Sequence, residues 1–217
     1  EKAHVVVSKK RSLEAARAYK GTKTAVHNFA SAKNPGGGVV NGANAQEECL
    51  CRCSDLYFCL NTSEMMDGFY HPHRAMSSLL YNGDVIYTPD IIVFKSDDAS
   101  PRTMPEKDWY EVDIITCAAP NLRHGILGGN TDLRTIHETR LRRMLDIAVT
   151  KGVESIVLGA FGCGVFMNDP AIVADASKRV LKDYLYAFKN IEYAIYCSPK
   201  NDSNYQAFRR TLAEYCG

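Results

Sequence analysis

Two glycine-rich segments constrain this sequence more than any other feature, because each follows a strand-like run and precedes a helix-like run. The first, at residues 34–38, comes after the apolar run at 24–29. The second, at residues 159–166, comes after Ser155–Leu158, whose composition predicts a strand buried on both faces. In largely parallel sheets, ligands bind where loops leave the carboxyl ends of the strands. The sequence therefore predicts that both loops border one ligand site.

Strand-like and helix-like runs alternate along the rest of the chain. We expect strands at residues 5–7, 24–29, 85–87, 91–94, 110–118, 155–158 and 191–197. We expect helices at residues 13–19, with Ser12 as their cap, and at 45–60, 132–151, 169–190 and 202–215. This alternation favours an α/β fold in which helices cover both faces of a central, mostly parallel sheet.

Length and composition are those of one globular domain. The 217 residues, 46% hydrophobic and 24% charged, fit a single domain spanning residues 1–217. No apolar run approaches the ~20 residues of a membrane-spanning helix, so no membrane association is expected. A net charge of +1 argues against a protein that binds long nucleic acids through their phosphates. Because the chain opens with Glu1 and not Met, we expect an N-terminal segment to precede it.

The eight cysteines are expected to be free thiols. A chain of this length does not need disulfides, and no secretion signal opens it, so a reducing, cytoplasmic location is the interpretation. Cys49, Cys51 and Cys53 are separated by single residues, whereas zinc sites usually space their cysteines by two, and no histidine follows at the usual distance. We therefore expect no metal.

An acidic pair follows the first glycine loop. Three consecutive glycines let a ligand approach the backbone closely, although a flexible loop is the alternative interpretation. Glu47 and Glu48 then open the predicted helix, where adjacent side chains point about 100° apart. They cannot flank one bond from opposite sides as ordinary glycosidase pairs do, so one carboxylate is expected to act and the other to hold a hydroxyl. The helix dipole lowers a Glu pKa there, whereas a like-charged neighbour and ligand phosphates raise it.

The second glycine loop has the composition of an anion site. Gly162 and Gly164 can form a nest of N–H groups for a diphosphate beside a helix N-terminus. A tight strand-to-helix turn is the alternative. No Gly-Lys-Ser/Thr follows, and Met167 stands where a dinucleotide-binding fingerprint needs its third glycine, so neither of those motifs applies.

Together these motifs resemble those of the poly(ADP-ribose) glycohydrolases. Three glycines, seven residues and then Gln-Glu-Glu form that family's signature, which stands here at residues 36–38 and 46–48. The segment Gly-Cys-Gly-Val-Phe followed by Asp169-Pro170 resembles its diphosphate loop. The flanking text, NFASAKNPGGG and YTPDIIVF, resembles the compact bacterial branch, and the likeness runs from about residue 24 to 208.

The resemblance implies a macrodomain-like fold, a three-layer α/β/α sandwich around a mixed, mostly parallel sheet. It implies that Glu48 is the catalytic acid/base, that Glu47 fixes ribose hydroxyls, and that Asn34 helps to orient the same ribose. Gly162 to Val165 would hold the diphosphate and Phe166 would pack on the distal ribose. The full set of expected substrate-binding residues is Asn34, Gly36, Gly37, Gly38, Gln46, Gly162, Cys163, Gly164, Val165 and Phe166. No cofactor or metal is implied.

The chain also departs from the family. The N-terminal helical region of the bacterial branch is mostly absent, and so is the lobe that clamps adenine in large animal enzymes. Tyr81, Tyr87 and Tyr205 are candidate substitutes for that clamp. Weak binding within a long polymer favours exo-type cleavage, which releases ADP-ribose from chain ends.

Three functions remain open at this point. The first is hydrolysis of the ribose–ribose bond of poly(ADP-ribose). The second is removal of single ADP-ribose groups from modified protein or from a nucleic-acid base, and the third is an ADP-ribose reader without turnover. The expected partner is ADP-ribose or its polymer, with no stable protein partner.

Other conspicuous residues are given structural interpretations. His71-Pro72-His73 is read as a surface loop, and His27 either as a core histidine with satisfied hydrogen bonds or as a residue that supports those lining the site. Arg140, with Arg142 and Arg143, is read as part of a solvated helix face. Trp109 is expected to pack under the Pro-containing loop at residues 95–107.

Overall fold

A mixed sheet forms the centre of the computed structural model, which describes residues 1–123, 125 and 132–216. Within this described part the sheet has six strands in the order β1-β6-β5-β2-β4-β3. Neighbouring strands run parallel except β3, which lies antiparallel to β4 at one edge. The strands are β1 (His4–Ser8), β2 (Thr24–Ala30), β3 (Val85–Val93), β4 (Tyr110–Ala118), β5 (Ser155–Leu158) and β6 (Asn190–Ala194).

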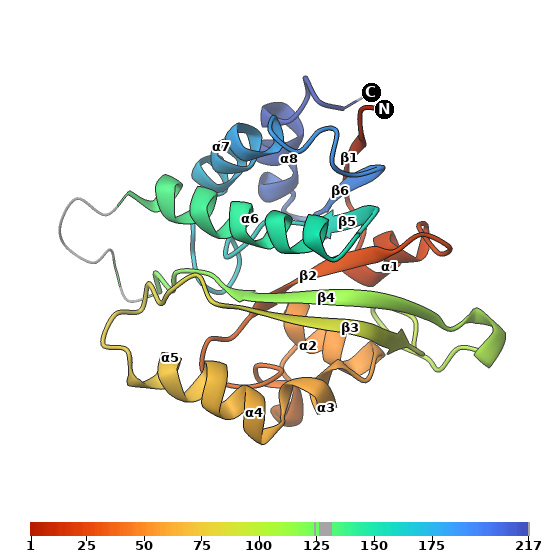
Figure 1. Ribbon diagram of the computed structural model, residues 1–217, viewed down its shortest axis with the longest axis vertical. Coiled ribbons are helices and arrows are strands. Elements are labelled where there is room, and N and C mark those ends of the chain that lie inside the picture. The colour runs from red at the N-terminus through yellow and green to blue at the C-terminus, as the bar shows by residue number, and fades with distance from the viewer. Residues whose placement is uncertain (124, 126–131, 217) are drawn as a thin grey trace.

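Helices cover both faces of this sheet (Figure 1). One face carries α6 (Leu133–Thr150), α7 (Pro170–Leu181) and α8 (Ser203–Thr211). The other carries α1 (Ser12–Arg17), α2 (Gln46–Cys53), α3 (Leu56–Leu60), α4 (Ser63–Met65) and α5 (His71–Ala75), with the short turns η1 (Val39–Asn41) and η2 (Met66–Tyr70). A further turn, η3 (Glu106–Asp108), precedes β4. These three layers confirm the predicted α/β/α class with a mixed, mostly parallel sheet.

The central strands carry apolar residues on both faces because their residues alternate between two buried cores. On β4, Ile114 belongs to the core shared with α1, α2 and α3, whereas Ile115 belongs to the core shared with α6, α7 and α8. Val157 and Ile156 divide in the same way on β5. Since side chains of a strand alternate between faces, a sheet covered on both sides favours apolar residues on both faces of its central strands.

Several predicted element boundaries differ from the structure. The helix predicted at 45–60 is divided at Ser54, which adopts an extended conformation and donates from its Oγ to the carbonyl of Leu50 (2.7 Å). The strands predicted at 85–87 and 91–94 are one strand, β3, interrupted by an irregularity around Asp90. Asp90 has φ 55° and donates its N–H to Asp113 Oδ1 (3.0 Å), which holds this left-handed residue in place.

Helix ends also differ from the predictions. Ser12 does not cap α1 but lies within it, buried, while the helix predicted at 169–190 ends at Leu181. Two helices begin at aspartates that act as N-caps. The carboxylates of Asp132 and Asp169 accept hydrogen bonds from N–H groups in the first turns of α6 and α7.

Two structural interpretations of polar residues are wrong. His73 does not lie on a surface loop but is fully buried on α5, with its ring nitrogens bonded to Phe69 O (2.7 Å) and Asn82 Oδ1 (2.8 Å). Arg140 is not solvated but 3% exposed, and it donates to the carbonyls of Ala118 and Leu80. Trp109 behaves as predicted, since its Nε1 donates to Met104 O (2.9 Å) in the Pro-containing loop.

Candidate active site

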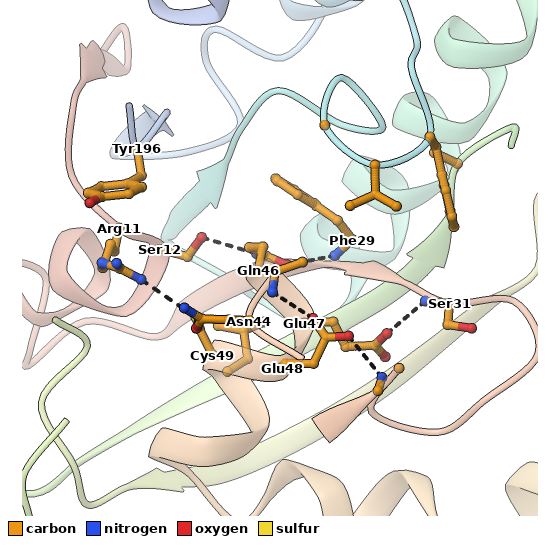
Figure 2. A pocket seen from close by; sticks show the side chains of 18 of the residues that line it. Arg11, Ser12, Phe29, Ser31, Asn44, Gln46, Glu47, Glu48, Cys49 and Tyr196 are labelled. Carbon is orange, nitrogen blue, oxygen red and sulfur yellow. Dashed lines mark hydrogen bonds between the residues drawn. The ribbon is translucent and has the colours of Figure 1, made fainter. Parts of the chain in front are cut away.

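A cavity of about 960 Å³ lies where β2, β5 and β6 end. Its walls come from the first glycine loop, the start of α2, the second glycine loop and two segments that flank β1 and β6. Figure 2 shows the labelled side chains of α2 gathered at one side, with Arg11 and Tyr196 at a distance from the carboxylates. The predicted convergence of the two glycine loops on one site is therefore present.

Glu48 is fixed by the backbone that surrounds it. Its Oε1 accepts the N–H of Gly38 (2.8 Å), and its Oε2 accepts the N–H of Ala45 (3.0 Å), the residue just before helix α2 (Figure 2). Gly37 has φ +61°, and a Cβ on it would overlap Glu48 Oε1 and come within 3.0 Å of Glu47 Oε2. The glycine loop can therefore lie against both carboxyl groups only because it carries no side chain there.

Glu47 occupies a more buried and less polar position than its neighbour. It is 3% exposed, and its carboxyl oxygens accept the N–H of Ser31 (2.7 Å) and the amide of Asn28 (3.3 Å). Burial raises the pKa of Glu47 to about 8, and the adjacent Glu48 acts in the same direction, although the two hydrogen bonds oppose it. Burial thus outweighs these hydrogen bonds and favours the protonated form of Glu47.

Gln46 connects α2 to the end of β2. Its side-chain oxygen accepts the N–H of Phe29 (2.9 Å), and its nitrogen donates to Ser12 Oγ (3.0 Å) and to the carbonyl of His27 (2.7 Å). Gln46 lines the cavity, but both ends of its amide are already paired with protein groups. Its main effect is to set the position of the two glutamates that follow it.

The second glycine loop offers unpaired backbone donors to the cavity. Gly162, Gly164, Val165 and Phe166 line the wall, and within the described residues the N–H groups of Gly164, Val165 and Phe166 have no hydrogen-bond acceptor. Gly162 has φ +76°, so the chain turns there in a conformation that favours glycine. Such a run of free N–H groups can bind a diphosphate without any basic side chain.

Three other predicted residues lie in different surroundings. Asn34 lines the cavity and is exposed, and its Oδ1 accepts from Arg74 (3.4 Å). Gly36 and Cys163 are not among the lining residues: Gly36 packs against Tyr57 and Cys51, and Cys163 packs against the core under α6 and α7.

Sequence reasoning missed the wall formed by Arg11 and Tyr196. Arg11 lies over the Tyr196 ring (4.1 Å to its centroid) and stands 3.9 Å from Asp97. Tyr196 lines the cavity and is 56% exposed, whereas Tyr81, Tyr87 and Tyr205 do not line it. Tyr196 follows the carboxyl end of β6, so the rule that placed the two glycine loops could have identified it.

Among the described residues, no group of three or more His, Cys, Asp or Glu side chains is arranged to hold a metal ion. No helix in the described ranges has the length and apolar character to cross a membrane.

Comparison with known proteins gives a consistent result. The family model described as "Microbial-type PARG, catalytic domain" matches residues 1–96. The structure of poly(ADP-ribose) glycohydrolase from Thermomonospora curvata, bound to the inhibitor ADP-HPD, is 35% identical, with a TM-score of 0.87 over 96% of this chain and 78% of that one. No curated protein sequence matches.

A second solved structure agrees with the first. The enzyme from Deinococcus radiodurans in complex with ADP-ribose is 36% identical, with a TM-score of 0.87 over 99% of this chain and 86% of that one. Identity and coverage at this level exceed a likeness of fold, and the glycines at 37 and 38 meet the Gln-Glu-Glu residues in the cavity. The chain belongs to the microbial-type poly(ADP-ribose) glycohydrolase family.

Proposed function

We propose that this chain is a glycoside hydrolase that cleaves the ribose–ribose O-glycosidic bond of poly(ADP-ribose) and releases ADP-ribose. The observation that carries the proposal is the pair of fixed carboxyl groups, Glu47 and Glu48, which share one cavity with the free N–H groups of residues 164–166. One part of this cavity suits a glycosidic bond and the other suits a diphosphate. Membership of the family and the ADP-ribose bound to the Deinococcus enzyme support this assignment.

Glu48 is the proposed acid/base. As the glycosidic C–O bond breaks, Glu48 gives a proton to the leaving ribose oxygen, and positive charge develops on the anomeric carbon. Water then adds to that carbon and returns a proton to Glu48. The N–H groups of Gly38 and Ala45 keep the carboxyl group in position throughout. Glu47, whose protonated form burial favours, hydrogen-bonds to a ribose hydroxyl, and Asn34 orients the same ribose.

The remaining cavity is assigned to the rest of the ADP-ribose unit. The N–H groups of the second glycine loop bind the diphosphate, and Phe166 packs on the distal ribose. Tyr196, exposed on the cavity wall and backed by Arg11, provides a flat face on which adenine can stack. Because backbone N–H groups bind the diphosphate, the loop needs no basic side chain of its own.

We also propose that cleavage is exo-type, that residues 1–217 form a single domain and that the protein is cytoplasmic. Gly217 itself lies outside the described residues. The product distribution tests the direction of cleavage: free ADP-ribose from the first time points supports exo-type action, whereas early release of short oligomers supports internal cleavage.

Incubation with poly(ADP-ribose) tests the function itself. Release of ADP-ribose by the wild-type chain is the expected result. If the polymer stays intact while ADP-ribose binds in a calorimeter, the same assay on singly ADP-ribosylated protein and nucleic acid identifies a mono-ADP-ribose hydrolase. If those substrates also survive, the chain is a reader module.

A further inference from the structure

A small cavity lies behind the second glycine loop, separate from the active-site cavity. It measures about 20 Å³ and lies between β2, β6, α6 and α7. His27, His137 and Tyr193 line it, and all three are buried. Among the described protein atoms, His27 Nε2 and His137 Nδ1 have no hydrogen-bond partner, and the Tyr193 hydroxyl has none within ordinary hydrogen-bond geometry. Ser177 also lines the cavity beside Tyr193, but its hydroxyl already donates to the carbonyl of Val173 (2.9 Å). The expectation that protein groups satisfy His27 is therefore wrong for that nitrogen.

The hydrogen-bond roles of these atoms follow from Asn168. Its Nδ2 donates to the carbonyls of Pro120 (2.8 Å), Gly162 (3.1 Å) and Phe166 (3.3 Å), which identifies the other terminal atom as the oxygen. That oxygen only accepts, so His137 Nε2, which lies 2.9 Å from it, must donate. Burial lowers the pKa of His137 to about 4, so the ring is neutral and its Nδ1 is an acceptor.

Three buried polar atoms whose residues line one small cavity call for a further partner. Leaving a buried polar atom unpaired costs about 1–3 kcal/mol, and three such atoms in one place are rare in native proteins. A cavity of about 20 Å³ exceeds the roughly 10–15 Å³ that one water needs. Water also matches the roles, because it can accept from the Tyr193 hydroxyl, donate to His137 Nδ1 and pair with His27 Nε2 in either direction.

We propose that this cavity is a binding site for one structural water, which bridges His27, His137 and Tyr193 and so fixes Asn168 as the positioning residue of the diphosphate loop. Asn168 ties the loop at both ends, through Gly162 and Phe166. A Cβ on Gly162 would stand 2.7 Å from Asn168 Nδ2, so the loop turns directly against this amide. The assignment of the loop to a diphosphate rests on the proposed function, but the water site does not.

A crystal structure of the wild-type protein at high resolution tests the water directly. The expected result is an ordered water within hydrogen-bond distance of His27 Nε2, His137 Nδ1 and the Tyr193 hydroxyl. A cavity without solvent density, or a direct bond between any two of these side chains, overturns the proposal. This readout does not depend on activity or on ADP-ribose binding.

A pair of Tyr→Phe variants tests the same site in solution. Tyr70 also carries a buried hydroxyl without a partner among the described residues, but it lines neither of these two cavities. Tyr193→Phe removes a bond to water and is expected to lower Tm by about 2–4 °C. Tyr70→Phe removes an unpaired group and is expected to leave Tm unchanged or to raise it. If Tyr193→Phe matches Tyr70→Phe, no water binds there.

Asn168→Asp tests the positioning role, because a carboxylate cannot donate to the carbonyls of Gly162 and Phe166 in the loop, or to that of Pro120. Affinity for ADP-ribose is expected to fall at least about 10-fold by calorimetry, with KM changing more than kcat. Asn190→Asp is the matched control: Asn190 donates to Ser155 Oγ (2.9 Å) at the start of β6, away from the loop. Equal affinities for the two variants, or a loss of Tm in Asn168→Asp without a loss of affinity, contradict the positioning role.

Discussion

Replacing Gly37 by alanine is expected to displace the carboxyl groups of Glu47 and Glu48 while the protein remains folded. The new methyl group would overlap Glu48 Oε1 and come within 3.0 Å of Glu47 Oε2. To restore ordinary van der Waals contact, Glu48 has to retreat by about 1 Å. That movement stretches its hydrogen bond with the N–H of Gly38, which is 2.8 Å in the structure.

Backbone strain must be separated from this displacement, and Gly42→Ala does so. Gly37 has φ +61° and Gly42 has φ +78°, so alanine is strained at both positions, by about 1–2 kcal/mol. However, a Cβ at Gly42 would meet no atom within 4 Å. Both variants are expected to lose about 2–8 °C in Tm.

Initial rates of ADP-ribose release from poly(ADP-ribose) then distinguish the two variants. A misplacement of about 1 Å at a reacting group costs about 100-fold, so kcat/KM of Gly37→Ala is expected to fall by roughly that factor, or about 2.7 kcal/mol. Gly42→Ala is expected to stay within about twofold of wild type. If Gly37→Ala keeps its activity, or if Gly42→Ala loses as much, close approach of the loop to the carboxylates does not control catalysis.

Three further predictions concern pH, ligand stacking and packing. The folded pKa of Glu47, about 8, is above its unfolded value of 4.5, so the native state binds more protons between these values. The free energy of unfolding should therefore fall as pH rises from about 4.5 to 8, by at most ~1.4 kcal/mol per unit, and denaturant titrations should find this slope reduced in Glu47→Gln. Tyr196→Ala should weaken calorimetric binding of ADP-ribose about 10-fold, whereas Tyr186→Ala, at a residue that is 77% exposed and outside the cavity wall, should not. Leu50→Ala, at a core position that is 1% exposed, should lower the free energy of unfolding by about 2–5 kcal/mol in chemical denaturation. Val149 is 44% exposed, so Val149→Ala should lower it much less, and equal losses for the two variants would contradict the place of Leu50 in the core.

Local chemistry made the sheet and the two glycine loops predictable. The runs at β2, β4 and β5 are rich in apolar residues, and a glycine-rich segment follows both β2 and β5. Long-range pairing was not visible in the same way. Nothing near Asp90 in the sequence reveals that Asp113, on the neighbouring strand, accepts its N–H. The sequence therefore predicts two strands where the structure has one, β3.

The misread polar residues have the same origin. Arg140 lies in a helix with a basic, solvated pattern, and only the carbonyls of Leu80 and Ala118, far away in sequence, explain its burial. His73 sits beside a proline and suggests a loop, but Phe69 and Asn82 supply partners for both ring nitrogens. Polar side chains can be buried when residues distant in sequence form hydrogen bonds with them. The periodicity of apolar residues in the sequence does not show which residues these partners are.

Turnover and binding measured together for Glu48→Gln test the central claim most directly. The account predicts that this variant no longer releases ADP-ribose from poly(ADP-ribose) but binds ADP-ribose with nearly wild-type affinity, because the amide keeps the shape of the side chain without its acid/base chemistry. Glu64→Gln, at an exposed residue of α4, should retain both properties. Loss of both turnover and binding in Glu48→Gln would show that Glu48 is structural, and retained turnover would show that another group performs the chemistry.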